Sequence, residues 1–206
     1  MRELSIVEIR FMDHLKKRGC PVCSASDEAV RLFFESLFYE NVNDVGVRKR
    51  FESDSGFCAF HTRIAEKFSD PSGTAILYAS LLVKTDDDAG GHAGKCRCCE
   101  VRDEAVGRAV TSVGKFLENG SLFANLGKNL LFCRRHFSML SRKLEGKNLK
   151  LMEKFQDEKL KEIHKLLNDV LKRIDYTSKT KDFTDDEMFA LFSAPKYFST
   201  FEELNR

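Results

Sequence analysis

Two short motifs, each present twice, constrain this chain of 206 residues more than any other feature of its sequence. A Cys-x2-Cys pair is followed by a Cys-x2-His pair, first with 34 residues between them and then, in a second set, with 33. The two Cys-x2-Cys pairs start 76 residues apart, and the two Cys-x2-His pairs start 75 apart. Two sets in register indicate a duplicated unit that is held together by metal. The predicted metal ligands are Cys20, Cys23, Cys58, His61, Cys96, Cys99, Cys133 and His136.

Zinc suits this ligand set best, because thiolate and imidazole ligands give it a tetrahedral shell without redox chemistry. We therefore expect two zinc ions per chain, both structural. Taken in chain order, the first ion would be held by Cys20, Cys23 and the Cys58–His61 pair, and the second by the four later ligands. The spacing does not settle this grouping, since the two Cys-x2-His arms could be exchanged between the sites.

Other chemistries of paired cysteines fit the sequence less well. A thiol–disulfide centre would need a βαβ setting and a helix start that acidifies a thiol, and no strand-rich pattern surrounds either pair. An iron–sulfur cluster accepts three Cys and one His, although less usually. Catalytic zinc keeps an open coordination position, whereas each set here supplies four protein ligands. Cys98, between Cys96 and Cys99, is either a substitute ligand or a spare buried thiol, and the spacing favours the spare thiol.

Residues outside the ligands also indicate duplication. The tetrapeptide Asp-Glu-Ala-Val begins four residues after Cys23, at 27–30, and again four residues after Cys99, at 103–106. A run of acidic residues followed by paired glycines, at 85–91, is the best candidate for a linker. The predicted division is a first zinc-binding unit at 1–88, a second at 96–145 and a C-terminal helical extension at 146–206, together in one compact globule.

Apolar periodicity predicts an all-α fold of seven to nine helices, in two related zinc-stapled halves with a long C-terminal helix. Ser5 and Glu8 have the form of a capping box at the start of the first helix, which Gly19 ends. After the long helix we expect a short helix at 185–192 and a break at Pro195. An apolar stripe on the long helix could pack within the domain or against a second copy, which would give a homodimer. The stripe comprises Leu160, Ile163, Leu167, Val170 and Ile174.

Charge and apolar content limit the surroundings in which the chain would work. Its 34 basic and 32 acidic residues give a net charge of +2, which creates no long-range field for nucleic acid or an anionic membrane. The longest near-apolar run, 74–83, is too short to span a bilayer, and no charged-then-apolar leader opens the chain. Seven cysteines in close pairs indicate metal binding in a reducing cytosol. We therefore expect a cytoplasmic protein that does not act at a membrane.

The sequence favours an interaction or regulatory module over an enzyme, because no nucleophile–base pair accompanies the predicted ligands. Its expected partner is another protein. Two alternatives stay open, a thiol–disulfide redox protein using Cys-x2-Cys and a nucleic-acid-binding zinc protein. The second would need a clustered basic face, which only residues 134–135, 142–143 and 147–150 suggest.

The most function-like stretch outside the metal motifs is a run of carboxylates, amides and one guanidinium between residues 35 and 48. It could form a partner or ligand surface, or it could cap a helix and hold a turn through side-chain hydrogen bonds. We favour the structural interpretation, because the second unit has no copy of it in register. Its members are Glu35, Tyr39, Glu40, Asn41, Asn43, Asp44 and Arg48.

Several stretches, spread over most of the chain, carry a resemblance to one protein family. They are Cys20-Pro21-Val22-Cys23, residues 35–44, Val47-Arg48, Gly56-Phe57-Cys58, His61, Leu131-Phe132-Cys133, His136 and Asp175-Tyr176. In these stretches the chain resembles an uncharacterised prokaryotic family, domain of unknown function 6062. The resemblance implies a bacterial or archaeal source and brings no established activity. Arg97-Cys98 departs from the pattern, since a proline there would match the first Cys-x2-Cys pair better.

Overall fold

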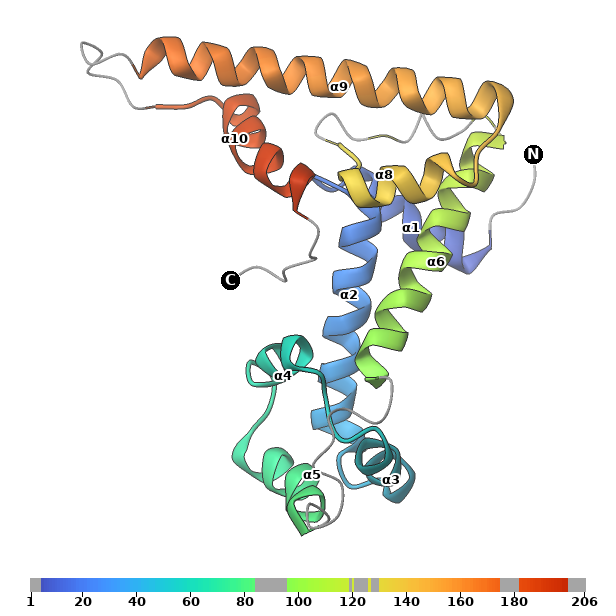
Figure 1. Ribbon diagram of the computed structural model, residues 1–206, viewed down its shortest axis with the longest axis vertical. Coiled ribbons are helices and arrows are strands. Elements are labelled where there is room, and N and C mark those ends of the chain that lie inside the picture. The colour runs from blue at the N-terminus through green and yellow to red at the C-terminus, as the bar shows by residue number, and fades with distance from the viewer. Residues whose placement is uncertain are drawn as a thin grey trace. The chain divides into compact units, whose positions relative to one another are not determined.

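The computed structural model describes residues 5–83, 96–118, 120, 126, 130–174 and 182–199. Within these ranges the chain is all-α, as the apolar periodicity predicts, and an isolated parallel bridge between Gly19 and Leu130 is its β-type pairing. The elements are α1 (Ile6–Lys16), α2 (Pro21–Ser36), the π-helix η1 (Leu37–Asn41), α3 (Val45–Ser53), α4 (Ala59–Ala65), α5 (Pro71–Val83), α6 (Arg97–Glu118), α8 (Arg134–Ser141), α9 (Gly146–Arg173) and α10 (Asp185–Phe198) (Figure 1).

Side-chain caps set where several of these helices begin. The Ser5 hydroxyl accepts from the backbone N–H of Glu8 at 3.3 Å, and the Glu8 carboxylate accepts from the Ser5 N–H at 2.8 Å. This is the capping box that the sequence predicts for α1. Thr184 and Glu187 make the same reciprocal pair at the start of α10. Each cap satisfies backbone donors that a helix start would otherwise leave without partners.

The chain forms two compact units that are not consecutive in sequence. Among the described residues, unit 1 comprises those within 5–25 and 107–199, and unit 2 comprises those within 26–106. The helix α2 therefore begins in unit 1 and continues into unit 2, whereas α6 begins in unit 2 and continues into unit 1. The division predicted from the sequence, at 1–88, 96–145 and 146–206, follows the order of the motifs along the chain. It stays a prediction.

Phenylalanine rings fill the core of unit 2. Phe34 is fully buried, lies edge-on to Phe57 at 5.2 Å between ring centroids and stacks on Phe68 at 5.8 Å. Phe51 packs edge-on against Phe57 at 5.0 Å. Cys96 lies in the same hydrophobic cluster. Because Phe57 directly precedes a Cys-x2-His pair and Cys96 opens a Cys-x2-Cys pair, this core holds both kinds of motif in place.

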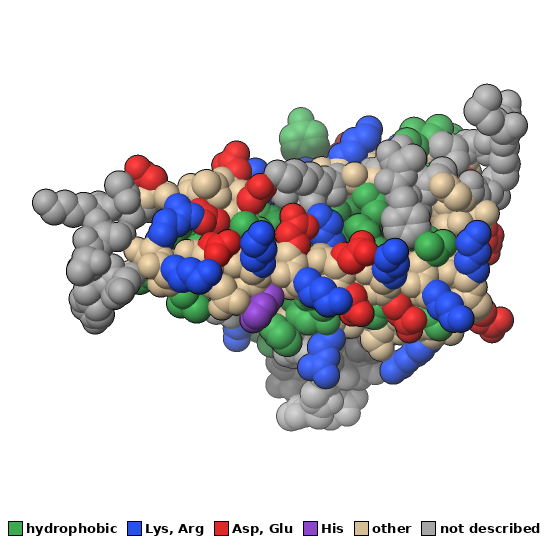
Figure 2. Space-filling view, turned by 90° about the horizontal axis from the view of Figure 1, so that it is seen from above, with side chains coloured by type: hydrophobic (Ala, Val, Ile, Leu, Met, Phe, Trp, Pro, Cys, Tyr) green, Lys and Arg blue, Asp and Glu red, His purple; other side chains and the backbone are tan. Residues whose placement is uncertain are grey.

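In unit 1, α10 packs against the long helix α9. Ile163 of α9 forms a buried cluster with Leu131 and with Phe189 and Ala190 of α10. Also in unit 1, Phe11 of α1 stacks on Phe116 of α6 with 6.4 Å between ring centroids. The outer face of α9 carries basic and acidic side chains interleaved along its length (Figure 2). The amphipathic character predicted for this helix is therefore confirmed.

Some predicted details differ from the structure. The helix α10 continues through Pro195 to Phe198, so the break expected at Pro195 is wrong. Proline cannot donate a backbone hydrogen bond, but two contacts beyond it offset this loss. The Ser199 N–H donates to the Pro195 carbonyl at 3.1 Å, and Tyr197 packs on the α9–α10 cluster. Ile174, the last member of the predicted stripe, is 59% exposed. The predicted linker at 85–91 lies outside the described residues.

None of the helices in the described part of the chain combines the length and the apolar content that a bilayer span requires.

Candidate metal centres

The eight predicted ligands gather into two clusters, each with three cysteines and one histidine. In each cluster the ligand atoms all lie within 4.8 Å of one another. Site 1, in unit 1, comprises Cys20, Cys23, Cys133 and His136. Site 2, in unit 2, comprises Cys58, His61, Cys96 and Cys99.

The arms of the two motif sets are exchanged. Grouping in chain order, which pairs Cys20 and Cys23 with Cys58 and His61, is wrong, and the alternative that the spacing leaves open is the one that the structure adopts. The first Cys-x2-Cys pair meets the second Cys-x2-His pair, and the second Cys-x2-Cys pair meets the first Cys-x2-His pair. Each set of the sequence therefore contributes two ligands to each site.

The two clusters have nearly identical ligand geometry. The His136 Nδ1 lies 3.3 Å from the sulfurs of Cys23 and Cys133 and 3.5 Å from that of Cys20. In site 1 the Cys23 and Cys133 sulfurs are 3.7 Å apart.

Site 2 repeats these distances. The His61 Nδ1 lies 3.3 Å from the sulfurs of Cys58 and Cys99 and 3.5 Å from that of Cys96. The Cys58 and Cys99 sulfurs are again 3.7 Å apart.

These distances fit a tetrahedral ion between the four donors. A zinc ion about 2.3 Å from each sulfur would separate two sulfurs by about 3.8 Å. An imidazole nitrogen about 2.0 Å from the same ion would lie about 3.5 Å from each sulfur. Both separations agree with those in the clusters to within about 0.2 Å. The donor set and its spacing therefore suit a four-coordinate metal ion at each site.

Every ligand pair stands at the start of a helix. Cys20 directly precedes α2, Cys96 directly precedes α6, and Cys58 and Cys133 are the N-cap residues of α4 and α8. Since Cys-x2-His spans three residues, the N-cap sulfur and the histidine of the first turn face the same side. Three thiolates and a divalent ion carry a net negative charge, and the positive ends of the long helices α2 and α6 stabilise it.

Backbone contacts around Gly19 bring the two halves of site 1 together. Gly19 has φ +91°, a conformation that side-chain-bearing residues rarely adopt, and it turns the chain from the end of α1 into Cys20. Its carbonyl accepts from the Leu131 N–H at 3.2 Å. Leu131 is two residues before Cys133, so this hydrogen bond and the adjoining bridge at Leu130 set the approach of the second ligand pair.

The carbonyl that precedes each Cys-x2-His pair is held in a different way at the two sites. At site 1, the fully buried Gln156 of α9 donates from Nε2 to the Phe132 carbonyl at 2.7 Å. At site 2, the Thr62 hydroxyl donates to the Phe57 carbonyl at 3.3 Å and to the Cys58 carbonyl at 3.1 Å. Thr62 lies one turn into α4 itself, so this support is local to the motif, whereas at site 1 it comes from a distant helix.

The thiols of both clusters have shifted pKa values. The hydrogen bond from the Cys23 thiol to Cys133 raises the pKa of Cys23, and hydrogen bonds from Cys20 and Cys23 lower the pKa of Cys133. In site 2, burial raises the pKa of Cys96 and raises that of Cys99 to about 12. Metal binding therefore displaces protons from the thiols of both sites, and Cys133 is the sulfur that carries negative charge most readily.

Cys98 is not a ligand of either cluster. Its side chain is fully buried among the phenylalanines of unit 2, and burial raises the pKa of its thiol. Cys96 and Cys99, on either side of it, both lie in site 2. The interpretation of Cys98 as a spare buried thiol therefore fits the structure.

The polar stretch between residues 35 and 48 is spread over the end of α2, η1 and α3. Asp44 caps α3 by accepting from the Val47 N–H at 2.8 Å, and Asn41 donates to the Ser36 carbonyl at 3.0 Å. Both contacts are side-chain hydrogen bonds that cap a helix or hold a turn, as the structural interpretation of this stretch expects. The other members do not converge in the same way. Glu35 pairs with Arg31, Tyr39 is 90% exposed, Glu40 and Asn43 are exposed, and Arg48 is half-buried.

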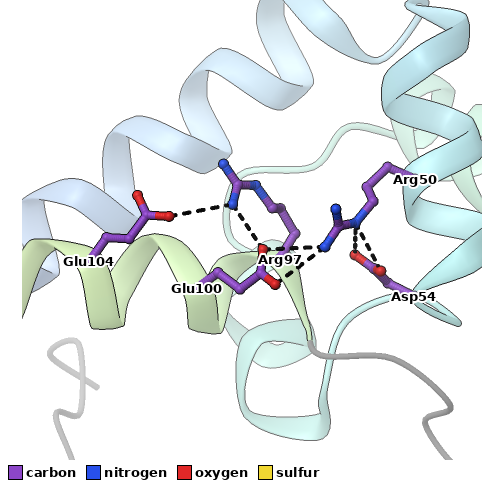
Figure 3. A network of polar contacts seen from close by, with 5 residues as sticks. All are labelled: Arg50, Asp54, Arg97, Glu100 and Glu104. Carbon is purple, nitrogen blue, oxygen red and sulfur yellow. Dashed lines mark hydrogen bonds and ion pairs between the residues drawn. The ribbon is translucent and has the colours of Figure 1, made fainter.

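An ion-pair network lies beside the Cys-x2-Cys pair of site 2 (Figure 3). Arg50 of α3 binds Asp54 at 2.8 Å and reaches Glu100 of α6 at 3.3 Å. Glu100 also accepts from Arg97 at 2.9 Å, and Arg97 lies 3.8 Å from Glu104. Because Arg97 and Glu100 flank the ligands Cys96 and Cys99 in sequence, the network fixes the first turn of α6 against α3.

The sequence gives no direct signal for these supporting residues. Gln156 lies 20 residues beyond His136 and belongs to neither motif. The signal that could have marked it is a glutamine at a position of α9 where the helix is buried. Thr62 could have been noticed, because a hydroxyl at the fourth position after Cys58 can reach back to the preceding carbonyls. The network around Arg50 depends on how α3 and α6 meet, which the spacing of the motifs does not reveal.

The fold and the sites define an all-α protein with two Cys3His clusters that can each hold a metal ion. No family model matches the chain, and no solved structure matches it. The chain is similar to the "Uncharacterized 23.9 kDa protein in xynA 3'region" of Caldicellulosiruptor sp. (strain Rt8B.4), with 36% identity over 72 residues. That match spans 35% of this chain and 35% of the relative's length. It does not show a family, so the resemblance to domain of unknown function 6062 stays a prediction.

Proposed function

We propose that this chain is a zinc-stabilised helical module whose two ions are structural and whose output is interaction with, or regulation of, another protein. The observation that carries the proposal is the pair of closed Cys3His clusters, each with sulfur–sulfur and sulfur–nitrogen distances suited to tetrahedral zinc.

The composition of each cluster supports a structural role for the metal. Catalytic zinc sites keep one coordination position open for water or substrate, whereas four protein donors surround each site here. The histidine of each site is fully buried, and its cysteines are half-buried or buried, so solvent has little access to the ion. When bound, zinc supplies a covalent tie between two helix starts that lie far apart in sequence.

Two features support a cytoplasmic location and a protein partner. Six of the seven cysteines lie in the two metal clusters, and a reducing compartment keeps such thiols available for metal. On the C-terminal helices, large apolar side chains are exposed at Leu171 and Ile174 of the α9 end and at Phe192 and Phe198 of α10. Such residues suit contact with another protein, including a second copy of this chain through its C-terminal helices.

Metal analysis of the purified protein tests the proposal. We expect about two zinc ions per chain, and we expect a strong chelator at neutral pH to remove them together with most of the helical circular dichroism signal. A metal-free sample that stays fully folded would contradict a structural role.

The redox alternative makes a different prediction. If Cys-x2-Cys were a thiol–disulfide centre, insulin-reduction activity would survive His61→Ala and His136→Ala but not Cys20→Ser or Cys96→Ser. The structural-zinc proposal expects no such activity in any of these variants, and it expects each substitution to lower the zinc content instead.

A further inference from the structure

One exposed face of the first turns of α9 carries a shallow, open groove. It has a volume of about 430 Å³ and is lined by Gly146, Lys147, Lys150, Leu151 and Lys154. The lysine stems and the exposed Leu151 make its lining largely apolar, and three of the five lining residues are lysines. We refer to these five residues as the α9 groove.

Positive charge is concentrated at this groove. Residues 142–154 contain five Lys and Arg and two Glu, a net +3 in thirteen residues, although the whole chain has a net charge of only +2. Arg142, Lys143, Lys147 and Lys150 are exposed, and none of them forms an ion pair within the described part of the chain. Lys154 has one weak pair, with Glu158 at 3.9 Å.

Lys147 lies in the first turn of α9, where a positive side chain does not stabilise the helix. The first turn of α9 contains no acidic residue, and its N-cap, Glu145, makes no side-chain cap hydrogen bond. Positive side chains at a helix N-terminus are unfavourable because they face the positive end of the helix dipole. Helix stability therefore accounts for Lys154, which pairs with Glu158, but not for Lys147, which a negatively charged partner would accommodate.

We propose that the α9 groove is the docking site for an acidic amphipathic helix of a partner protein. The inference rests on the proposed function and specifies the class of partner. Acidic side chains of such a helix would pair with the three ammonium groups, while one or two of its apolar side chains would enter the groove over Leu151. Nucleic acid fits less well, because no aromatic ring lines the groove to stack on a base and phosphates gain nothing from an apolar floor.

The test uses the full-length, zinc-loaded chain and three fluorescein-labelled probes. The first is a peptide of about 18 residues with Leu at positions i, i+3, i+4 and i+7 and Glu at most others. The second has the same composition in scrambled order, which removes the apolar face. The third is a single-stranded DNA of the same length. Binding is measured by fluorescence anisotropy at low and moderate salt, so that the charge contribution is visible.

Three variants separate charge from apolar contact. The groove variant combines Lys147→Glu, Lys150→Glu and Lys154→Glu. The floor variant is Leu151→Ser. The matched control combines Lys161→Glu, Lys165→Glu and Lys172→Glu, three exposed lysines on the same helix outside the groove. Lys147→Glu favours the helix dipole, whereas Lys154→Glu loses the weak pair with Glu158, so the groove variant is expected to unfold at about the same temperature as the wild type.

We expect the amphipathic peptide to bind at least about tenfold more tightly than the scrambled peptide. The groove variant should weaken that binding by at least about tenfold, the floor variant by about threefold or more, and the control variant by less than about twofold. The proposal is overturned if the scrambled peptide binds equally well, if no peptide binds, or if DNA binds more tightly and Leu151→Ser leaves DNA binding unchanged. Each of these results is compatible with two structural zinc ions per chain, so failure here is distinguishable from failure of the proposed function.

Discussion

The two metal centres have the same donors at the same distances, but the chain builds them in different ways. Site 2 joins ligands at most 41 residues apart, all within the continuous segment Ser26–Val106. Site 1 joins ligands more than 100 residues apart, since Cys23 meets Cys133 across a separation of 110. Unit 2 is therefore inserted between the two parts of the chain that form site 1.

This difference gives the two ions unequal roles. Closing the longer loop costs about 1 kcal/mol more chain entropy than closing the shorter one, on a logarithmic dependence on loop length. The tie at site 1 therefore constrains the unfolded chain more, and its loss releases a longer segment. Site 2 joins the segments 58–61 and 96–99, whereas site 1 joins the more distant segments 20–23 and 133–136.

The largest expected effect concerns which ligands share an ion. Substituting Cys23 and Cys133 together by Ser removes two ligands from site 1 alone, so we expect one of two zinc ions to be lost. Substituting Cys23 and Cys58 together by Ser damages both sites, so we expect both ions to be lost. A structural zinc ion contributes about 10–16 kcal/mol in zinc-finger peptides, so the double variants should differ clearly in stability as well as in metal content.

Metal content is measured by elemental analysis of the purified variants. Grouping of the ligands in chain order gives the opposite result, because Cys23 and Cys58 would then share one ion and Cys23 and Cys133 would not. Retention of one zinc by the Cys23→Ser, Cys58→Ser variant would therefore contradict the exchanged arrangement.

The same comparison shows what the sequence could and could not predict. The eight ligands are predictable, because residue types and the three-residue spacing within each pair express the demands of a tetrahedral ion directly. Their grouping depends on helix length. The sixteen residues of α2 carry the chain about 24 Å away from Cys20 and Cys23. The later helix α3 has nine residues and spans about 14 Å, so α3 alone is too short to return the chain to them. The number of residues between two motifs does not report the distance between them in space. The supporting residue Gln156 was missed for a similar reason, since only tertiary packing of α9 brings it to Phe132.

The second prediction concerns pH. Each sulfur that binds zinc must lose its proton, so zinc affinity rises with pH and zinc is released on acidification. At site 2, the pKa of Cys99 is raised to about 12 and that of Cys96 is raised by burial, so both hold their protons at neutral pH. At site 1, the pKa of Cys23 is raised but that of Cys133 is lowered by hydrogen bonds from Cys20 and Cys23, so Cys133 gives up its proton more readily. We expect zinc affinity to depend less steeply on pH at site 1.

Variants that keep one intact metal site make the pH dependence of each site measurable. His61→Ala leaves site 1 as the intact centre, and His136→Ala leaves site 2. Competition with a chromophoric chelator between about pH 6.5 and 8 gives the slope for each, in a range where ordinary thiols still hold most of their protons. Equal slopes in the two variants would contradict the difference in thiol charge between the sites.

The third prediction concerns the carbonyl that precedes each Cys-x2-His pair. Gln156→Leu removes the donor to the Phe132 carbonyl in a fully buried position, and we expect it to lower the free energy of unfolding by about 1–3 kcal/mol. Thr62→Val removes the corresponding donor at site 2, but its bonds are longer and local to α4. We expect this change to cost about 0.5–1.5 kcal/mol. Denaturant unfolding of the zinc-loaded proteins measures both values.

Metal competition assigns each of these effects to a site. Gln156→Leu should weaken zinc binding at site 1 and leave site 2 unchanged, and Thr62→Val should do the reverse. If Gln156→Leu lowered zinc affinity at both sites equally, its effect would be general destabilisation, and support of the site 1 motif would not explain it.

The smallest expected effect concerns the ion-pair network beside site 2. Arg50 is half-exposed, and the nearly buried Asp54 raises its pKa through a hydrogen bond. Arg50→Ala should lower stability less than Gln156→Leu, and the loss should shrink in about 1 M salt, because exposed ion pairs are screened. Arg31→Ala, which breaks the exposed pair with Glu35 on α2, is the matched control and should have a still smaller effect.

Since Arg50 also reaches Glu100 next to the ligand Cys99, only Arg50→Ala should speed the loss of zinc from site 2 to a chelator. Equal rates of zinc loss in the two variants would show that the network does not hold the first turn of α6 in place.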